Sequence, residues 1–273
     1  MRILFFGIVC VLLMGCAKEE QRNYKKITIA YDQYPETLLD VYVPITSMPV
    51  KAYPVVVYIH GGGWDSGDKS QWESKVPFFS ERRYVSVSIN YRLSPSVTHP
   101  THIEDVSNAL NWICDNISSY GGDPNYLILI GHSAGAHLAL LAVTNQKYIQ
   151  QAGVNIDCIK DVYSLDIGGY LVMNELIYDN VSLLPRIYAA IGSNKENDAW
   201  VDFAPYNFVA ADKYIPRITL IYSDDMYRYK ANTIFKEKLD ECGVNNRTYI
   251  LPSYSHYDVM ANFPQYNGEI YLF

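Results

Sequence analysis

The sequence predicts an α/β fold built on one open, mostly parallel sheet of eight strands. Short apolar runs alternate with helical patterns along the chain, which is the order expected when helices connect parallel strands. The inner runs are continuously apolar, as strands are when helices cover both faces of a sheet. The expected strands are Ile27–Tyr31, Leu38–Val43, Pro54–Ile59, Val85–Asn90, Tyr126–Ile130, Asp161–Leu165, Arg217–Tyr222 and Arg247–Leu251.

The helices are predicted by apolar residues that recur three or four positions apart. The first clear set is Ile103, Val106, Leu110, Ile113 and Ile117. Two more helices are expected over Ala134–Thr144 and Tyr229–Glu241, and Gly243 is a suitable C-cap for the second. The first two strands are expected to pair as an antiparallel edge.

The N-terminus has the pattern of a signal peptide over residues 1–15: a basic start at Arg2, then an apolar core. This core is too short for a membrane-spanning helix, which needs about 20 residues. Leu13-Met14-Gly15-Cys16 resembles a bacterial lipobox, in which the cysteine is lipidated and becomes the new N-terminus. We therefore expect an exported bacterial lipoprotein, anchored in a membrane through Cys16 and facing the periplasm or the outer surface. Plain secretion with cleavage nearby is the alternative.

The remainder divides into a polar tether over residues 16–24 and one domain over 25–273. The irregular stretch at about 169–200 lies between two predicted core strands, and we expect it to form a small helical cap. A net charge of −7 argues against nucleic acid or an anionic membrane surface as a partner. The lipid alone would then hold the protein at a membrane. Cys114, Cys158 and Cys242 remain in the domain; they do not form a disulfide framework, and we expect no disulfide.

Gly131-His132-Ser133-Ala134-Gly135 is the most informative segment. It has the pattern G-x-S-x-G and lies between a predicted strand and a predicted helix, which is the context of a nucleophile elbow. Glycines two residues before and after the serine avoid clashes in such a tight turn. The segment predicts Ser133 as a nucleophile, with the N–H of Ala134 as a donor to the oxyanion.

A second motif, His60-Gly61-Gly62-Gly63-Trp64, follows the predicted strand Pro54–Ile59. Consecutive glycines let a loop expose its backbone N–H groups, because no Cβ blocks the approach. An H-G-G-G loop of this kind supplies the rest of the oxyanion hole in esterases.

A serine hydroxyl needs a base to accept its proton, and in this fold the order along the chain is Ser, then Asp or Glu, then His. Only His137 and His256 follow Ser133, and no acid precedes His137 in that interval. His256 lies just after the last predicted strand, where a base would be delivered. We therefore predict His256 as the base.

The acid is expected at the C-terminal end of a strand between Ser133 and His256. Asp224 and Asp225 directly follow the predicted strand that ends at Tyr222. We favour Asp225 and keep Asp224 as the alternative, with the other of the two solvated or capping the next helix. Asp166, after another apolar stretch, is an outside candidate.

The other histidines have structural interpretations. His60 is expected to brace the glycine loop by hydrogen bonding, and His132 fills the variable position of the elbow. His99 and His102 fall in a polar connection. No close-spaced His, Cys and Asp set has the pattern of a metal site, and the glycine loop lacks the Lys-Ser/Thr of a phosphate loop. We predict neither metal nor cofactor.

Several blocks together carry a family resemblance: Val87–Leu93, Pro100, Asp105-Val106, Tyr120–Asn125 and the elbow at 131–135. Over residues 25 to about 262 the chain resembles esterases of the α/β-hydrolase superfamily, in the hormone-sensitive-lipase-like and kynurenine-formamidase-like branches. The H-S-A-G form of the elbow, with Trp64 after the glycines, leans toward formamidase-like and feruloyl-esterase-like members.

The resemblance implies Ser133 as nucleophile and His256 as base, and by position Gly62, Gly63 and Ala134 as oxyanion donors. It does not assign the acid. In the family the acid usually precedes a Pro-x-Val-Pro turn, and here Met226-Tyr227-Arg228-Tyr229 follows instead.

These features predict a serine hydrolase of the carboxylesterase type, with a Ser-His-Asp triad and an acyl-enzyme intermediate. The expected substrate is an ester of a small acyl or aromatic acid, on a small molecule or a carbohydrate. One alternative is an amide or formamide hydrolase, because the same residues serve both reactions. Another is a non-catalytic, glycan-binding surface lipoprotein on the same fold.

Overall fold

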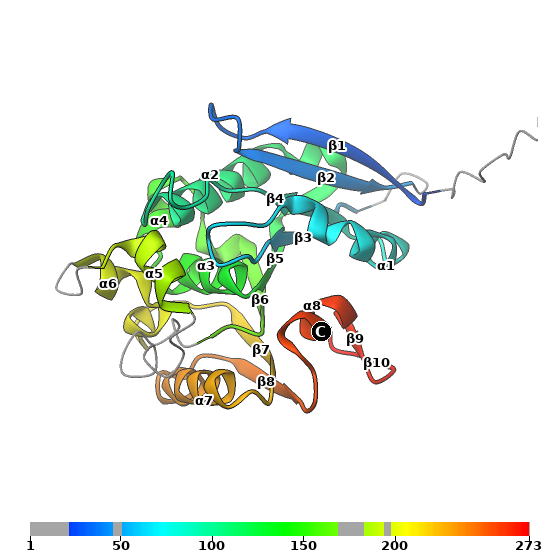
Figure 1. The fold of residues 1–273 in the computed structure, drawn as a ribbon. Coiled ribbons are helices and arrows are strands. Elements are labelled where there is room, and N and C mark those ends of the chain that lie inside the picture. Colours follow the sequence, from blue (N-terminus) through cyan, green and yellow to red (C-terminus); the bar gives the residue numbers. More distant parts are fainter. Residues whose placement is uncertain (1–21, 46–50, 169–182, 194–197, 273) are drawn as a thin grey trace, which may run out of the picture.

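The computed structural model describes residues 22–45, 51–168, 183–193 and 198–272 (Figure 1). An eight-stranded sheet with the strand order β1-β2-β4-β3-β5-β6-β7-β8 runs through the domain. The strands are β1 Tyr24–Ala30, β2 Leu38–Pro44, β3 Tyr53–Ile59, β4 Val85–Ile89, β5 Gly122–His132, β6 Ile159–Leu165, β7 Arg217–Ser223 and β8 Asn246–Leu251. All eight predicted strands are confirmed.

Strand β2 pairs antiparallel with both β1 and β4, and all pairs from β4 to β8 are parallel. The predicted antiparallel edge is therefore confirmed. The chain turns to opposite sides of β3: β4 lies on one side and β5 on the other. In open α/β sheets, ligands bind beyond the C-terminal ends of the strands at such a reversal.

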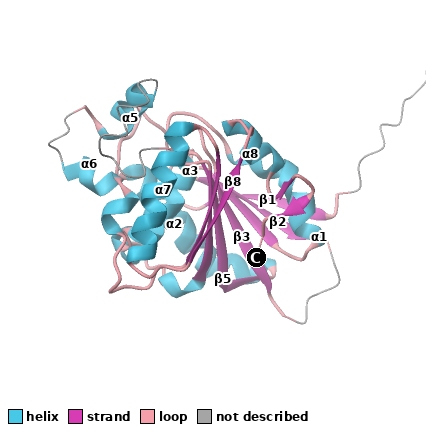
Figure 2. Cartoon of the chain, turned by 90° about the horizontal axis from the view of Figure 1, so that it is seen from below, coloured by secondary structure: helices cyan, strands magenta, loops and turns pink. Residues whose placement is uncertain are grey.

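Helices cover both faces of the sheet, as Figure 2 shows. One face is covered by three helices, α2 (Thr101–Asn116), α3 (Ala134–Thr144) and α7 (Met226–Glu241). The other face is covered by α1 (Val76–Glu81) and α8 (His256–Asn262). The predicted helices correspond to α2, α3 and α7, and Gly243 has the left-handed φ of +69° expected after the end of α7. The shorter elements are α4 Lys147–Gln151, α5 Leu184–Ile191, α6 Asp198–Phe203, the 3₁₀ helices η1 Lys69–Lys75, η2 Ile117–Tyr120, η3 Ile156–Cys158 and η7 Pro205–Phe208, and the hairpin β9 Gln265–Tyr266 and β10 Glu269–Ile270.

The apolar core has two layers, one on each face of the sheet. Along β3, Val55, Val57 and Ile59 belong to one layer, whereas Val56 and Tyr58 belong to the other. Successive side chains of a strand point to opposite faces, so a strand covered on both sides must be apolar at every position.

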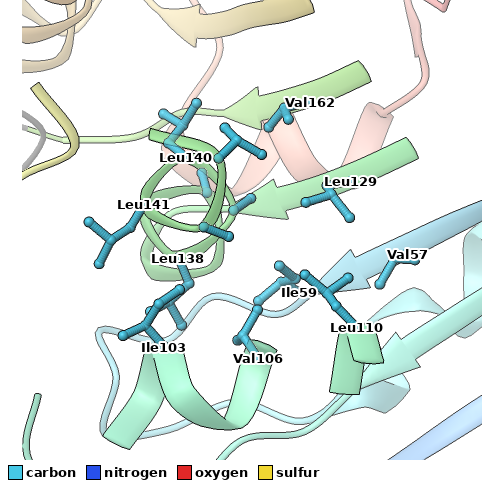
Figure 3. Packing of buried hydrophobic residues seen from close by; sticks show 14 of the residues in the cluster. Val57, Ile59, Ile103, Val106, Leu110, Leu129, Leu138, Leu140, Leu141 and Val162 are labelled. Atoms are coloured by element: carbon cyan, nitrogen blue, oxygen red, sulfur yellow. The ribbon is translucent and has the colours of Figure 1, made fainter. Parts of the chain in front are cut away.

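Helix α3 occupies the middle of the larger layer, where it packs on the sheet beside α2 (Figure 3). All eleven of its residues are buried. This burial fixes the position of its N-terminus, which directly follows Ser133.

Part of the sequence-based organisation falls outside the described residues: the signal peptide 1–15, Cys16 and most of the tether. The predicted cap at 169–200 is described only in part, and this part includes α5 and the start of α6. No helix within the described ranges is long and apolar enough to span a bilayer. The thiols of Cys114 and Cys158 lie 3.6 Å apart, and both are free, as is Cys242.

The steric requirement for glycine in the elbow can be tested by its effect on stability. An added Cβ on Gly135 would lie 2.0 Å from the carbonyl oxygen of Ile59 on β3, so Gly135→Ala must displace α3 or β3. We expect a loss of about 3 kcal/mol or more in the free energy of unfolding, or no folded protein, in urea titrations. The control is Gly268→Ala, where φ is +83° but nothing lies within 4 Å of the new Cβ. It should cost only about 1–2 kcal/mol from left-handed strain. Equal losses in the two variants would contradict the clash.

Candidate active site

Ser133 lies in a strained turn between β5 and α3. Its φ of +54° and ψ of −119° are rare for a residue with a side chain. Its N–H donates to the carbonyl of Leu165 over 2.9 Å, which ties the turn to the end of β6. A Cβ on Gly131 would lie 2.3 Å from the carbonyl oxygen of Gly135. The elbow predicted from the sequence has the expected geometry, and both glycines are sterically required.

The glycine loop after β3 lies beside the elbow. Gly62 and Gly63 have φ values of +118° and +61°, and both line the same cavity as Ser133. Among the described residues, no backbone carbonyl accepts a hydrogen bond from either N–H. Ala134 is the first residue of α3, so its N–H has no acceptor within the helix. These three backbone donors are the ones that the family resemblance implied.

His60 braces this loop, as predicted. Its Nδ1–H donates to the carbonyl of Gly61 over 2.8 Å, and its ring stacks on Tyr91 at 4.4 Å between centroids. Burial lowers the pKa of His60 to about 4, so its imidazole stays neutral. Residues of the 87–93 block complete the support: the Tyr91 hydroxyl donates to the carbonyl of His60, and Arg92 forms a bidentate ion pair with buried Asp105.

His256 begins α8 and lines the same cavity as Ser133. Its position is fixed by a capping box, in which the Ser255 and Asp258 side chains bond to each other's backbone N–H. The Nδ1 atom of His256 lies 2.6 Å from Oδ2 of Asp166. A carboxylate only accepts, so Nδ1 carries the proton and the neutral imidazole presents Nε2 as an acceptor. This is the tautomer that a base needs.

The carboxylate that contacts His256 is therefore Asp166. The prediction that Asp225, or alternatively Asp224, would be this partner was wrong. Asp225 is the N-cap of α7 and accepts from the backbone N–H of Arg228. Asp224 accepts from the backbone N–H of Ser253 over 3.2 Å. Both are exposed, whereas Asp166 is fully buried.

Four groups hold the Asp166 carboxylate. Ser223 donates to Oδ1 through its N–H at 2.8 Å and its hydroxyl at 2.9 Å. Oδ2 receives His256 Nδ1 and lies 3.1 Å from Nε of Arg228, whose Nη1 also donates to the Asp166 carbonyl. Burial alone would raise the pKa of Asp166, but the hydrogen bond from His256, the charge of Arg228 and the Ser223 N–H hold that pKa below its ordinary value. The carboxyl is thus ionised at neutral pH.

The sequence did not reveal the role of His132. Its Nε2–H donates to the carbonyl of His256 over 3.0 Å, and the two rings stack with centroids 4.5 Å apart. Burial, with the neighbouring His256 charge, lowers the pKa of His132 to about 3. The residue next to the nucleophile therefore stays neutral and fixes the loop that carries the base.

Three other histidines lie outside the site. His137 is buried in α3 and donates from Nε2 to the carbonyl of Phe203. His99 and His102 are both buried; His99 lies in the connection before α2, and His102 lies in α2 itself. His99 bonds to Asp202, which also receives Lys147 and Tyr148 and so ties α6 to α4. Among the residues that the structure describes, no cluster of three or more His, Cys, Asp or Glu side chains fits a metal ion.

The cavity over Ser133 has a volume of about 600 Å³ and is partly open. Its lining comes from the glycine loop, the elbow, α5, α7 and α8. The lining residues include Trp64, Gln71, Leu183, Tyr257 and Met260, together with Arg186 and Arg228. A mixed apolar and polar cavity of this size suits a small organic ligand.

Comparison with known families matches the BD-FAE profile to residues 39–239, most of the domain and all of the elbow. The chain belongs to the BD-FAE family. The match includes Ser133 and Asp166 but ends before His256.

Curated relatives of the family are named as esterases. A probable isoprenylcysteine alpha-carbonyl methylesterase of Arabidopsis thaliana is 30% identical over 260 residues, covering 90% of this chain and 60% of the relative. Esterase LipQ of Mycobacterium tuberculosis is 42% identical over 108 residues, covering 39% of this chain and 26% of LipQ. This chain thus spans about 60% of the length of the plant relative.

Solved structures confirm the α/β-hydrolase fold. Esterase B from Lactobacillus rhamnosis has a TM-score of 0.72 at 22% identity, covering 85% of this chain and 75% of that one. A truncated carbohydrate esterase from gut microbiota has a TM-score of 0.71 at 18% identity, covering 88% and 92% of the two chains.

The assignment of the carboxylate can be tested without turnover. The His256 Nδ1 proton, identified by its loss in His256→Gln, should give a downfield NMR resonance in the wild-type protein, because it is held in a short charge-assisted hydrogen bond. Asp166→Asn should abolish this resonance or move it upfield. Asp225→Asn, the matched control in an exposed cap, should leave it unchanged. Loss of the resonance in the Asp225 variant alone would refute the placement.

Proposed function

We propose that this protein is a serine carboxylic ester hydrolase. The observation that carries the proposal is the single cavity lined by Ser133 and His256, with the base held by the buried carboxylate of Asp166. A nucleophile, a base and an acid that orients the base define a catalytic triad by their geometry and roles. The names of the curated relatives, which are esterases, support the same reaction class.

In the proposed reaction, the Ser133 hydroxyl attacks the ester carbonyl while Nε2 of His256 takes its proton. The resulting imidazolium is stabilised by Asp166, which stays ionised. His256 then gives this proton to the departing alcohol, and the acyl group stays on Ser133. A water molecule, deprotonated by His256, attacks the acyl group and releases the acid.

The negative charge of the tetrahedral intermediate needs fixed donors. We assign this role to the backbone N–H groups of Gly62, Gly63 and Ala134, which lie on the two loops that meet beside Ser133. Each such donor typically contributes a factor of about 10²–10³ to the rate. The N-terminus of the buried helix α3 adds a favourable dipole at the same point.

The substrate that fits best is an ester of a small acyl or aromatic acid, on a small molecule or a carbohydrate. The cavity of about 600 Å³ holds a group of this size, and Tyr257 offers aromatic surface in its lining. A carbohydrate esterase among the structures of the same fold is consistent with a sugar on the alcohol side.

The proposal predicts that Ser133→Ala folds normally and loses at least about 10⁴-fold in kcat on p-nitrophenyl acetate and butyrate. A fluorophosphonate probe should label the wild-type protein and fail on the variant. Asp166→Asn should lose about as much, whereas Asp225→Asn should stay near the wild-type rate. Wild-type turnover by Ser133→Ala would remove this serine from the mechanism, and a higher kcat/KM on N-formylkynurenine than on any ester would make the protein an amide hydrolase.

We also propose that the protein is an exported lipoprotein anchored through Cys16, which the lipobox-like segment supports. In a bacterial host fed an alkyne-tagged fatty acid, the full-length chain should carry the tag and fractionate with membranes. Cys16→Ser should lose the tag, and Cys10→Ser, a control inside the signal peptide, should keep it. A tag that persists in Cys16→Ser would contradict the assignment.

A further inference from the structure

The charges around the cavity are unusual for an acidic protein. The chain has a net charge of −7, yet no Asp or Glu is among the described residues that line the cavity. The Arg and Lys residues among those described lining residues are Arg186 and Arg228. Two guanidinium groups therefore line the space over Ser133.

Arg228 is already engaged with the triad. Its Nε lies 3.1 Å from Oδ2 of Asp166, and its Nη1 donates to the Asp166 carbonyl over 2.6 Å. Only 12% of its side chain is exposed. Its charge is offset by the buried carboxylate, so it is poorly placed to bind a second one.

Arg186 is placed differently. It projects from α5 onto the glycine loop, where a Cβ on Gly63 would lie 2.7 Å from its Cδ and 2.8 Å from its Nη1. Its side chain is 48% exposed and, among the described residues, makes one ion pair, from Nε to Oδ2 of Asp65 at 3.3 Å. An exposed pair of this kind contributes little to stability. The Nη1 atom of the guanidinium lies next to Gly63, in the loop that holds the proposed oxyanion.

We propose that Arg186 binds an ionised carboxylate carried by the substrate in addition to its ester group. Guanidinium binds carboxylate through two parallel N–H···O bonds, which fixes orientation as well as affinity. The preferred substrates are then esters of acidic compounds, with the carboxylate on either the acyl or the alcohol part. This inference rests on the proposed esterase function and narrows its substrate class.

The test uses two matched pairs of esters, compared by kcat/KM. In the first pair, 4-acetoxybenzoate and its methyl ester, the carboxylate is on the leaving group. In the second pair, p-nitrophenyl hemiadipate and p-nitrophenyl heptanoate, it is on the acyl chain. The wild-type enzyme should favour the acidic ester about 10-fold or more in one pair, and that pair identifies the side on which the carboxylate binds. Salt at 0.5 M should reduce the preference, because it screens the half-exposed Arg186.

Two variants separate a binding role from a structural one. Arg186→Gln should abolish the preference, mainly by raising KM for the acidic ester, so that kcat/KM falls more for the acidic ester than for the neutral one. Asp65→Asn removes the carboxylate that competes for Arg186, so it should strengthen the preference about two- to threefold. The two substitutions are predicted to act in opposite directions.

Three outcomes overturn the inference. The first is a wild-type enzyme that hydrolyses acidic and neutral esters equally or favours the neutral ones. The second is an Arg186→Gln variant that loses activity equally on both members of a pair, which would assign Arg186 to support of the glycine loop. The third is no hydrolysis of any of the four esters and no labelling of Ser133 by fluorophosphonate. This last result would defeat the proposed function itself, and the other two would not.

Discussion

The buried carboxylate of Asp166 is the interaction on which the site depends. It is fully buried at the end of β6, and a buried charge is tolerated only when it is paired and hydrogen-bonded. Its partners come from three other elements: Ser223 from the end of β7, Arg228 from α7 and His256 from α8. Satisfying one carboxylate thus brings together the ends of distant chain segments. The same bonds give His256 the tautomer that a base requires.

A second constraint is steric and acts on the nucleophile. Three backbone segments come so close at the elbow that a side chain fits at neither Gly131 nor Gly135. The contact of Gly135 with Ile59 is the more informative one, because it locks the start of α3 against the end of β3. The glycine loop begins at that same strand end. Ser133 and its proposed oxyanion donors are therefore held in one rigid unit.

Local patterns in the sequence were sufficient to predict much of the fold and part of the candidate site. The strands, α3, Ser133 and the glycine loop each have a motif or a periodicity within a few residues. The acid has none, because its choice depends on the register between strands. Leu165 pairs with Ile221, so Asp166 lies beside the end of β7, and its N–H donates to the carbonyl of Ile221. Asp225, which follows the end of β7, is the N-cap of α7 instead. The sequence signal for Asp166 was its position directly after an apolar strand. Asp224 and Asp225 also follow an apolar strand, so this signal did not single out Asp166.

The position of the acid on β6 explains why His132 matters. His256 follows β8, and two strands, β6 and β7, separate β8 from the nucleophile strand β5. The loop that carries His256 must therefore cross the ends of β7 and β6 to reach Ser133. Asp166 holds only the Nδ1 side of the ring. His132, on β5 itself, holds the main chain of the same residue through its carbonyl oxygen. A carbonyl accepts hydrogen bonds only, so His132 must keep its proton on Nε2. Because burial keeps His132 neutral, this second anchor adds no charge beside the imidazolium that forms at His256 during attack.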